Sequence, residues 1–242
     1  MRIIRYLPLL ILINCSHDDV QVDPSEYPLL TEVKADGKAV NTFEYDGGQL
    51  IREFTYSTFC TNNSPVQQFS YTYQGNKVVK INSTDNMFFS SIGSMCDSSL
   101  GLKSEQVLEY DADGKIIKIT NAASYTIFEY NAQNQVVKQT IYLPDGTARY
   151  ISSFMYDSRG NLSDEIDAQG NLTSYIYDNK KNPYYYMKQR PNWISVYNKS
   201  PNNVVKATGS FIMFNKQYKY NALGFPTEVA ETNGATYYYI YQ

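Results

Sequence analysis

Histidine is nearly absent from this chain, and basic clusters are scarce. The single histidine is His17, so a Ser-His-Asp triad, a Cys-His dyad and a zinc site built from histidines are excluded within the chain. The formal net charge is -3, and no basic cluster occurs beyond Lys180-Lys181. The sequence therefore lacks the electrostatic signature of nucleic-acid binding, and we predict no nucleic-acid partner.

The remaining catalytic patterns are weak. The segment 111–114 (DADG) begins like a calcium-binding loop, but its twelfth position is Ala122 instead of Glu, which favours a plain turn. Asp164, Glu165 and Asp167 could act as paired carboxylates in glycoside cleavage, although solvated charge is the commoner role for such residues beside tight turns. We therefore predict no enzyme, no cofactor and no metal site, and rank a hydrolase that uses carboxylates alone below the other functions.

Stretches rich in alanine and leucine are also scarce, whereas tyrosine is abundant, with 24 copies. A hairpin signature recurs, in which a Tyr ends an apolar run, Asp or Asn follows, and Gly or Asn stands four residues after the Tyr. Clear copies occupy 110–114, 130–134, 156–160 and 220–224, looser copies begin at Tyr45, Tyr73 and Tyr177, and Ile166 takes the Tyr place in 166–170. The Asp or Asn can bond the backbone two residues on, and Gly or Asn tolerates left-handed backbone, so each copy predicts a type I turn with a bulge.

Upstream of each turn, large apolar residues stand two apart, so each pair shares one face of an extended strand. The pairs are Phe43/Tyr45, Leu108/Tyr110, Phe128/Tyr130, Phe154/Tyr156, Tyr175/Tyr177 and Tyr218/Tyr220. The residues between them are Glu44, Glu109, Glu129, Met155, Ile176 and Lys219. Most of these are charged, which predicts antiparallel sheet with one aromatic face and one face in water.

Counting the segments between turns predicts an all-β meander of about 14 to 16 strands over residues 29–242. Twist accumulates in so many strands, and an open aromatic face would be sticky, so we expect an open or closed soluble barrel with the aromatic face inside. The alternative is a barrel that spans the membrane. Outward-facing charges such as Lys118, Lys138 and Lys219 argue against it, because each Lys on a lipid-facing surface near mid-membrane would destabilise the barrel by about 2 to 4 kcal/mol.

The N-terminus has the pattern of an export signal. A short basic segment precedes the apolar residues 7–13, which are too few to span a bilayer, and the motif Leu12-Ile13-Asn14-Cys15 follows. This resembles a bacterial lipoprotein signal peptide at 1–14, with acylation of Cys15 and an acylated tether at 15–28; the alternative is a plain secretory signal with an incidental Cys. The acidic residues after Cys15 resemble the signal that sends Bacteroidetes-type lipoproteins to the exterior face of the outer membrane.

The strongest hairpin copies support a further resemblance. The segment 156–178 looks like two successive YD repeats of the Rhs and teneurin type, which build long curled β-sheets. The whole chain is similar to a family of Bacteroidetes lipoproteins of unknown function with a porin-like fold. The segments Asn182-Pro183-Tyr184-Tyr185 and 200–203 (SPNN) match the segment that this family shares. The resemblance implies a fold and an envelope location but no activity, and the repeats are too few to enclose a protein cargo.

Two insertions, at 83–103 and 182–203, interrupt the repeats, and loops of this length are usually functional or cover something. The second holds the candidate ligand-binding residues Tyr184, Tyr185, Tyr186, Trp193 and Tyr197. Their flat apolar rings and polar tips could form a stacking platform for sugars or an amphipathic ligand, or they could plug one mouth of the barrel.

The other two cysteines, Cys60 and Cys96, predict a disulfide in an exported chain, with two free buried thiols as the alternative. The predicted function is a non-enzymatic surface lipoprotein that binds an extracellular glycan or amphipathic ligand. A structural or assembly protein that contacts another envelope protein is the second possibility. A carrier of a lipid or small molecule is the third, and it requires a hollow barrel.

Overall fold

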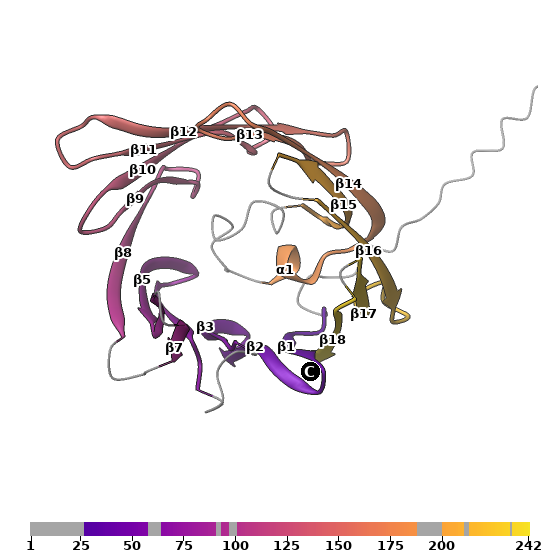
Figure 1. Cartoon of the computed structure of the whole chain (residues 1–242). Coiled ribbons are helices and arrows are strands. Elements are labelled where there is room, and N and C mark those ends of the chain that lie inside the picture. Colours follow the sequence, from indigo (N-terminus) through magenta and orange to yellow (C-terminus); the bar gives the residue numbers. More distant parts are fainter. Residues whose placement is uncertain are drawn as a thin grey trace, which may run out of the picture.

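The computed structural model describes residues 27–57, 64–90, 93–96, 101–187, 200–210, 213–232 and 234–242, with the backbone alone for 87–90 and 93–96 (Figure 1). The barrel strands are β1 (Leu30–Ala35), β2 (Lys38–Asp46), β3 (Gln49–Thr55), β4 (Gln67–Gln74), β5 (Lys77–Asp85), β8 (Leu102–Tyr110), β9 (Ile116–Thr120), β10 (Tyr125–Tyr130), β11 (Val136–Tyr142), β12 (Ala148–Tyr156), β13 (Leu162–Ile166), β14 (Leu172–Lys181), β15 (Asn202–Gly209), β16 (Met213–Tyr220), β17 (Pro226–Glu231) and β18 (Thr236–Tyr241). The short strands β6 (Met87–Ser90) and β7 (Gly93–Cys96) form a separate hairpin, and α1 covers Pro183–Tyr186.

These 16 strands form one closed barrel in which every neighbour pair follows the order of the sequence, apart from the step from β5 to β8 across the small hairpin. Every pairing is antiparallel, and β1 pairs with β18 to close the circle (Figure 1). The predicted all-β meander is therefore confirmed, and of the two forms expected the closed barrel is the one formed. In the described residues no helix is long and apolar enough to cross a membrane.

The turns have the chemistry that the repeat predicts. In the copy that begins at Tyr110, Asp111 Oδ1 accepts from Asp113 N at 3.0 Å and from Lys115 N at 2.8 Å. Gly114 has a φ of 84°, in the left-handed region where glycine has no steric penalty. The strand register shifts between Glu109 and Tyr110, which is the predicted bulge, and the copies at 130, 156 and 220 repeat the shift.

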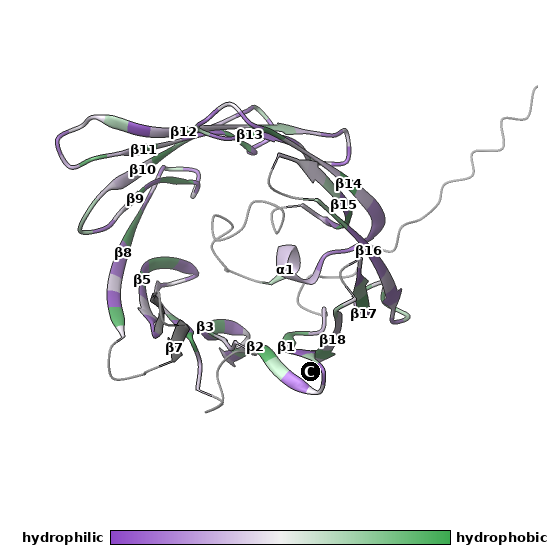
Figure 2. Ribbon diagram, in the orientation of Figure 1, coloured by the Kyte–Doolittle hydropathy of each residue, from purple (hydrophilic) through white to green (hydrophobic). Residues whose placement is uncertain are grey.

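Side chains alternate between the inside and the outside of the barrel as predicted. Phe43, Leu108, Phe128 and Phe154 are buried in the core. The charged residues between the apolar positions face outward, where they form cross-strand ion pairs: Glu44 with Arg52, Lys80 with Glu105, Glu109 with Lys118, Glu129 with Lys138, and Lys219 with Glu228. Figure 2 shows the resulting interleaving of hydrophobic and hydrophilic residues along β2 and β8.

The two ends of the barrel carry different connections. The β2–β3, β4–β5, β8–β9, β10–β11, β12–β13 and β16–β17 turns all lie at one end, together with the insertion that contains α1. We call this the tyrosine end, because the repeat tyrosines stand there, and the opposite end the loop end. Leu29 and Gln242 bond each other through their backbones, so both described termini also lie at the tyrosine end.

Candidate functional site: a cavity inside the barrel

The hydroxyls of the repeat tyrosines close the tyrosine end. Five of them, and Tyr241 of β18, donate to a backbone carbonyl at the first or second residue of the preceding neighbour strand and so tie adjacent strands together, whereas Tyr220 donates to the Asp178 carboxylate. The bonds are Tyr45 to Leu30 at 2.8 Å, Tyr73 to Leu50 at 2.5 Å, Tyr110 to Val78 at 2.6 Å, Tyr130 to Ile116 at 2.7 Å, Tyr156 to Val136 at 2.9 Å, and Tyr241 to Pro226 at 2.7 Å. The sequence pattern did not predict this role of the hydroxyls, although the preference for Tyr over Phe directly before the turns is a signal of it.

Tyr177 departs from this pattern because the insertion returns beside it. The Ser200 hydroxyl donates to the Tyr177 oxygen at 2.9 Å and accepts from Leu162 N at 3.0 Å. Ser200 is fully buried, and burial raises the pKa of the Tyr177 phenol well above its usual value. A serine 38 residues from Leu162 therefore takes the place that a carbonyl holds beside the six tyrosines above.

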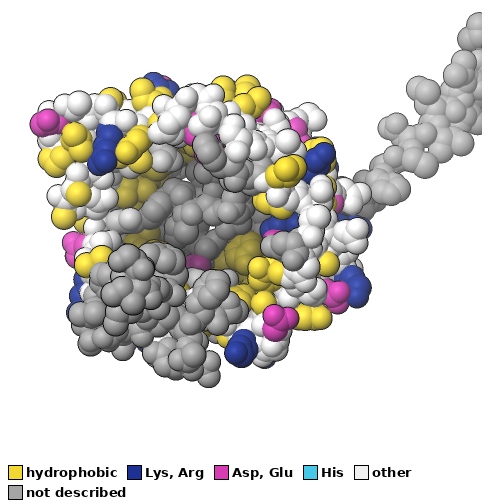
Figure 3. Space-filling model, in the orientation of Figure 1, with side chains coloured by type: hydrophobic (Ala, Val, Ile, Leu, Met, Phe, Trp, Pro, Cys, Tyr) yellow, Lys and Arg dark blue, Asp and Glu magenta, His cyan; other side chains and the backbone are white. Residues whose placement is uncertain are grey.

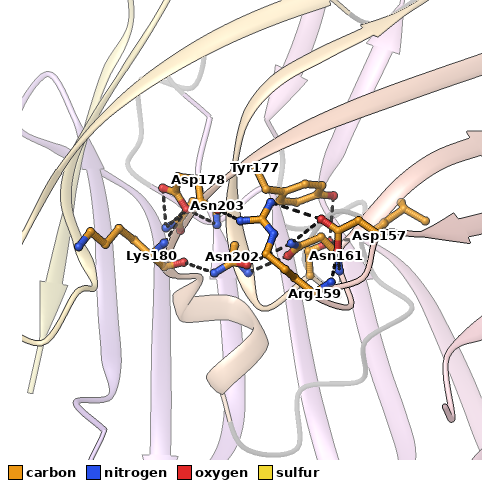
Figure 4. Close-up of polar contacts among 10 residues, drawn as sticks. Asp157, Arg159, Asn161, Tyr177, Asp178, Lys180, Asn202 and Asn203 are labelled. Atoms are coloured by element: carbon orange, nitrogen blue, oxygen red, sulfur yellow. Dashed lines mark hydrogen bonds and ion pairs between the residues drawn. The ribbon is translucent and has the colours of Figure 1, made fainter. Parts of the chain in front are cut away.

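A polar network fixes both ends of the insertion to the neighbouring strands (Figure 4). Asn161 Nδ2 donates to Asn202 Oδ1, and Asn202 N donates to Asn161 Oδ1, both at 3.1 Å. Arg159 donates to the Asp178 carbonyl at 2.6 Å, and Asn203 N donates to an Asp178 carboxylate oxygen at 3.1 Å. The network places the start of the insertion beside its end.

The two segments quoted for the family resemblance meet at this point. Asn182 N donates to the Pro201 carbonyl at 2.9 Å, and Asn182 Nδ2 donates to the Ser200 carbonyl at 2.9 Å. The Asn182 side chain also accepts from Tyr184 N and caps α1, whose first residue is Pro183. This anchoring holds α1 inside the barrel (Figure 1).

The three tyrosines of α1 have three different environments. The Tyr184 ring lies edge-on to Phe43 at 6.3 Å and to Tyr239 at 6.4 Å, inside the barrel. Tyr186 packs in the tyrosine end against Tyr27 and Phe225, with ring centroids 5.1 Å and 5.9 Å away. Tyr185 is 41% exposed. The candidate residues Trp193 and Tyr197 lie outside the described residues.

A cavity of about 780 Å³ occupies the barrel between α1 and the loop end. Tyr184 and Pro183 border it on the α1 side, and Asp36, Ser57 and Ala235 border it at the loop end. Among the described residues six aromatic side chains line its wall: Tyr56, Tyr184, Phe214, Tyr218, Tyr237 and Tyr239. Figure 3 shows hydrophobic side chains on several parts of this face, with Lys, Arg, Asp and Glu side chains scattered around its edge. Among the described residues, side chains fill the tyrosine end, and the cavity lies between α1 and the loop end.

The cavity wall also carries charge. Lys216 Nζ pairs with Glu231 Oε1 at 2.9 Å, and the buried Glu53 carboxylate accepts from the Tyr71 hydroxyl at 3.1 Å. Burial raises the pKa of Tyr237, with a further contribution from the charges of Glu231 and Asp36. Burial also raises the pKa of Tyr239 well above its usual value. These phenols therefore stay neutral near pH 7 and offer rings and hydroxyls to a ligand.

The carboxylates considered for glycoside cleavage do not converge. Asp164 faces outward and accepts from Ser174 at 2.6 Å, whereas Glu165 faces inward and accepts from Tyr175 at 3.2 Å. Asp167 accepts from the backbone of its own turn. Within the described ranges no group of three His, Cys, Asp or Glu side chains is placed to hold a metal ion.

The predicted modification sites lie largely outside the described residues. Cys15 and Cys60 are not described, and for Cys96, the last residue of β7, only the backbone is described. The lipidation of Cys15 and the Cys60–Cys96 disulfide therefore stay predictions.

Comparison with known protein families identifies the repeat. The RHS repeat family model matches residues 110–148. The chain thus contains an RHS repeat, as the YD signature predicted. The matched stretch begins at the hairpin copy at Tyr110 and ends before residues 156–178, the segment that most resembles YD repeats by its sequence. No curated protein matches the chain.

The solved structures that are similar to this chain include two porin-like proteins and one much longer chain. A porin-like protein from Bacteroides uniformis has 11% sequence identity and a TM-score of 0.44, and the match covers 88% of this chain and 98% of that one. A porin-like protein from Bacteroides vulgatus has 11% identity and a TM-score of 0.40, with 89% and 99% covered. TcdB2-TccC3 has 13% identity and a TM-score of 0.34, and the match covers 81% of this chain but only 9% of that one.

Proposed function

We propose that this protein is a non-enzymatic binding module of the bacterial envelope that holds an amphipathic ligand in its barrel cavity. The ligand would carry an apolar body and hydroxyl or other polar groups, as a glycan segment or a lipid-like molecule does. The observation that carries the proposal is the cavity itself. Its volume of about 780 Å³ lies within the range of about 300 to 1,000 Å³ of small-molecule sites.

The lining supports an amphipathic ligand rather than a purely apolar one. Tyr184, Tyr218, Tyr237 and Tyr239 bring ring faces and hydroxyls to the same cavity, which is the combination used to bind molecules with both apolar and polar surface. Tyr184 comes from the insertion for which the sequence predicted ligand contacts. The insertion would then both border the cavity and help to close the tyrosine end.

We further propose that the module hangs from the outer membrane by a lipid on Cys15 and faces the cell exterior. The described chain begins at the tyrosine end, where Tyr27 packs on Phe225 at 5.4 Å and lies under Lys181 Nζ at 4.6 Å. A tether that joins the barrel there would direct the tyrosine end toward the membrane. The loop end, where the cavity is bordered by Asp36 and Ser57, would then point away from it.

Calorimetry with decyl glucoside below its critical micelle concentration tests the binding proposal. Thr55 lines the cavity, whereas its neighbour Phe54 faces outward on the same strand. Thr55→Trp places a large side chain in the cavity and is expected to weaken binding about tenfold or more, while Phe54→Trp leaves it unchanged. Absence of binding by the unsubstituted protein, or equal binding by both variants, would contradict the proposal.

The anchor has a separate test in the cells that produce the protein. Mass spectrometry of the membrane-extracted protein is expected to show acylated Cys15, and Cys15→Ala is expected to move the protein into the soluble fraction. Surface protease is expected to digest the anchored protein in intact cells. Retention of the Cys15→Ala variant in the membrane would contradict the lipid anchor.

A second candidate function is assembly with another envelope protein, and the outer face offers one observation in its favour. Ile166 and Leu172 are opposite each other on β13 and β14 and face outward, with Ile176 two residues beyond Ser174 on the same face. All three are exposed, Ile176 by 55%. Leu172→Glu is expected to abolish capture of a partner protein from the native envelope. Thr55→Trp changes the cavity and not the outer face, so it is expected to leave this capture unchanged.

A further inference from the structure

We propose that the cavity selects a neutral ligand with a hydroxylated ring, such as a sugar, and that the phenol hydroxyls of Tyr237 and Tyr239 recognise the polar groups of that ring. This inference rests on the proposed function, since it requires that the cavity binds an amphipathic ligand. It adds the chemical class of the polar part of that ligand and the side chains that select it.

The inward-facing tyrosines of β18 are of two kinds. Tyr237, Tyr239 and Tyr241 stand two residues apart and pack on the barrel core, so they share the inner face of the strand. Tyr241 donates its hydroxyl to the Pro226 carbonyl at 2.7 Å and belongs to the closed tyrosine end. Tyr237 and Tyr239 lie nearer the loop end and line the cavity, and among the described residues neither hydroxyl has a hydrogen-bond partner. The fold therefore uses the hydroxyl of Tyr241 and leaves the other two to the cavity.

Tyr218 shows that lining the cavity does not by itself leave a hydroxyl unbonded. Its ring borders the cavity from β16, but its hydroxyl donates to the Val204 carbonyl of β15 at 3.0 Å. It thus ties two neighbouring strands together, as the repeat tyrosines do. Tyr237 and Tyr239 have no such role in the part of the chain that the structure describes, which makes them the better candidates for contact with a ligand.

Small side chains flank these two rings. In the strand register Tyr237 stands between Val229 of β17 and Ala35 of β1, and Tyr239 stands beside Val33. Val33, Ala35 and Val229 all line the cavity. Because they are much shorter than tyrosine, they form an apolar floor beside the two phenols. Such a floor fits the C–H face of a sugar ring, while hydroxyls at its edge fit the polar groups of the ring.

A further polar group stands across this floor. Asn41 of β2 is the register partner of Val33 and also lines the cavity. Its Nδ2 donates to Thr55 Oγ1 at 3.1 Å, whereas its Oδ1 has no hydrogen-bond partner within the described ranges. The floor is thus bordered by two phenols, which can donate and accept, and by an amide oxygen, which accepts. The hydroxyls of a ligand ring can pair with both kinds of group.

These polar groups are neutral near pH 7. Burial is the main cause that raises the pKa of Tyr237 and of Tyr239, so both phenols keep their protons. Their contacts with a ligand are therefore hydrogen bonds between neutral groups. A ligand without polar groups at this place would leave the hydroxyls unpaired, which costs binding free energy. A ring that carries several hydroxyls avoids this cost.

Two neutral probes with the same alkyl chain test the inference. The head of decyl glucoside is a hydroxylated ring, whereas the head of tetraethylene glycol monodecyl ether is a flexible chain of ether oxygens with one terminal hydroxyl. Calorimetry on the full chain, below each critical micelle concentration, is expected to give a dissociation constant about tenfold lower for the glucoside. Thr55→Trp is expected to weaken both probes, because they share the cavity.

Variants that remove a hydroxyl locate the selectivity. Tyr237→Phe and Tyr239→Phe keep the rings and are each expected to reduce the preference for the glucoside about threefold, and the double variant is expected to reduce it about tenfold. Tyr238→Phe makes the same change on the outer face of the same strand, where the side chain is 45% exposed. It is the matched control and should leave the preference unchanged.

Stability separates recognition from a structural role. Tyr237→Phe and Tyr239→Phe remove no hydrogen bond between described residues, so the midpoint of urea denaturation should not fall. Tyr241→Phe removes the bond to the Pro226 carbonyl, so it is expected to lower this midpoint and to keep the preference for the glucoside. A loss of the preference in Tyr241→Phe as large as in the cavity variants would overturn the assignment.

The outcomes also separate this inference from the proposed function. Equal or tighter binding of the ether than of the glucoside overturns the selectivity for a hydroxylated ring and leaves the binding module standing. A preference for the glucoside that survives in the double variant overturns the assignment to these two hydroxyls. If neither probe binds, the binding module and its selectivity fail together.

Discussion

Two turns on either side of β13, at 157–161 and 167–171, are built from the same hydrogen bonds. Asp157 Oδ1 accepts from Arg159 N and Asn161 N, both at 2.9 Å, and Asp157 Oδ2 accepts from the Asn161 side chain at 3.0 Å. Asp167 repeats these three bonds at 2.9, 2.8 and 2.9 Å with Gln169 and Asn171. The glycines of the two turns have φ angles of 84° and 83°.

The surroundings of the two turns differ completely. The first is at the tyrosine end, where Ser200 and Asn202 cover it and Leu162 is 0% exposed. The second is at the loop end, and Leu172, which follows Asn171 as Leu162 follows Asn161, is 49% exposed. Local sequence therefore determines the conformation of a turn, whereas its place in the barrel determines what covers it: Leu162 points into the closed end, and Leu172 faces outward.

The same difference separates the two ends of the whole barrel. At the tyrosine end, phenol hydroxyls bond carbonyls of neighbouring strands, and Leu30, Leu50 and Phe225 are almost fully buried. At the loop end the cavity begins and exposed apolar residues such as Leu102 stand at the rim. Among the described residues the tyrosine end is closed by buried side chains and hydroxyl bonds, and the cavity for which we propose a ligand lies toward the loop end.

Alkaline pH is expected to have the largest effect on the tyrosine end. Burial raises the pKa of Tyr73, Tyr130 and Tyr156 to about 12, from 10.0 in the unfolded chain. Because the unfolded chain loses these protons first, the stabilisation is complete below about pH 10 and is lost as the pH rises toward 12. Tyrosinate absorbance should therefore rise together with loss of the β circular dichroism signal. Ionisation of all tyrosines near pH 10 with the barrel intact would contradict this expectation.

The next largest effect is expected from a pair of leucines in equivalent turn positions. Leu162→Ala leaves a void in the closed end and should lower the free energy of unfolding by about 3 to 5 kcal/mol. Leu172→Ala removes a half-exposed side chain and should change it by less than about 0.5 kcal/mol. Urea denaturation measures both. Equal losses would contradict the difference in burial between these two leucines.

Asn161 and Asn171, which hold equivalent positions in the two turns, are expected to show a smaller difference in the free energy of unfolding, with the larger loss again at the tyrosine end. Asn161→Ala removes the partner of Asn202 N in a buried place and should lower the free energy of unfolding by about 1 to 3 kcal/mol. Asn171→Ala removes one side-chain bond within an exposed turn and should cost about 1 kcal/mol or less. The same denaturation experiment applies, and a larger loss for Asn171→Ala would reverse the comparison.

A single tyrosine hydroxyl is expected to have the smallest effect. Tyr156→Phe keeps the ring but removes the bond to the Val136 carbonyl, so the free energy of unfolding should fall by about 0.5 to 1.5 kcal/mol. Tyr150→Phe, in which the ring is 40% exposed near the loop end, serves as the control and should be neutral. If Tyr156→Phe did not lower the free energy of unfolding, the tyrosine hydroxyls would not be what stabilises the tyrosine end.

The fold followed from the sequence because its determinants are local. The Asp or Asn that bonds its own turn, the Gly or Asn with positive φ and the alternation around Glu109 and Glu129 all act within a few residues of one another. The cavity and the Ser200 bond to Leu162 depend on contacts between distant segments. Likewise, Asp164 and Glu165 were considered together because they are adjacent in sequence, yet strand pairing places them on opposite faces.

Amide hydrogen exchange at the two turns beside β13 tests the central claim, a closed tyrosine end and an open loop end, most directly. The amides of Asn161 and Leu162 are expected to exchange only by opening of the barrel, with protection close to the global free energy of unfolding. The amides of Asn171 and Leu172 are expected to exchange by local fluctuation, much faster, despite the matching turn geometry. Equal protection at the two turns, or greater protection at 171–172, would contradict the account.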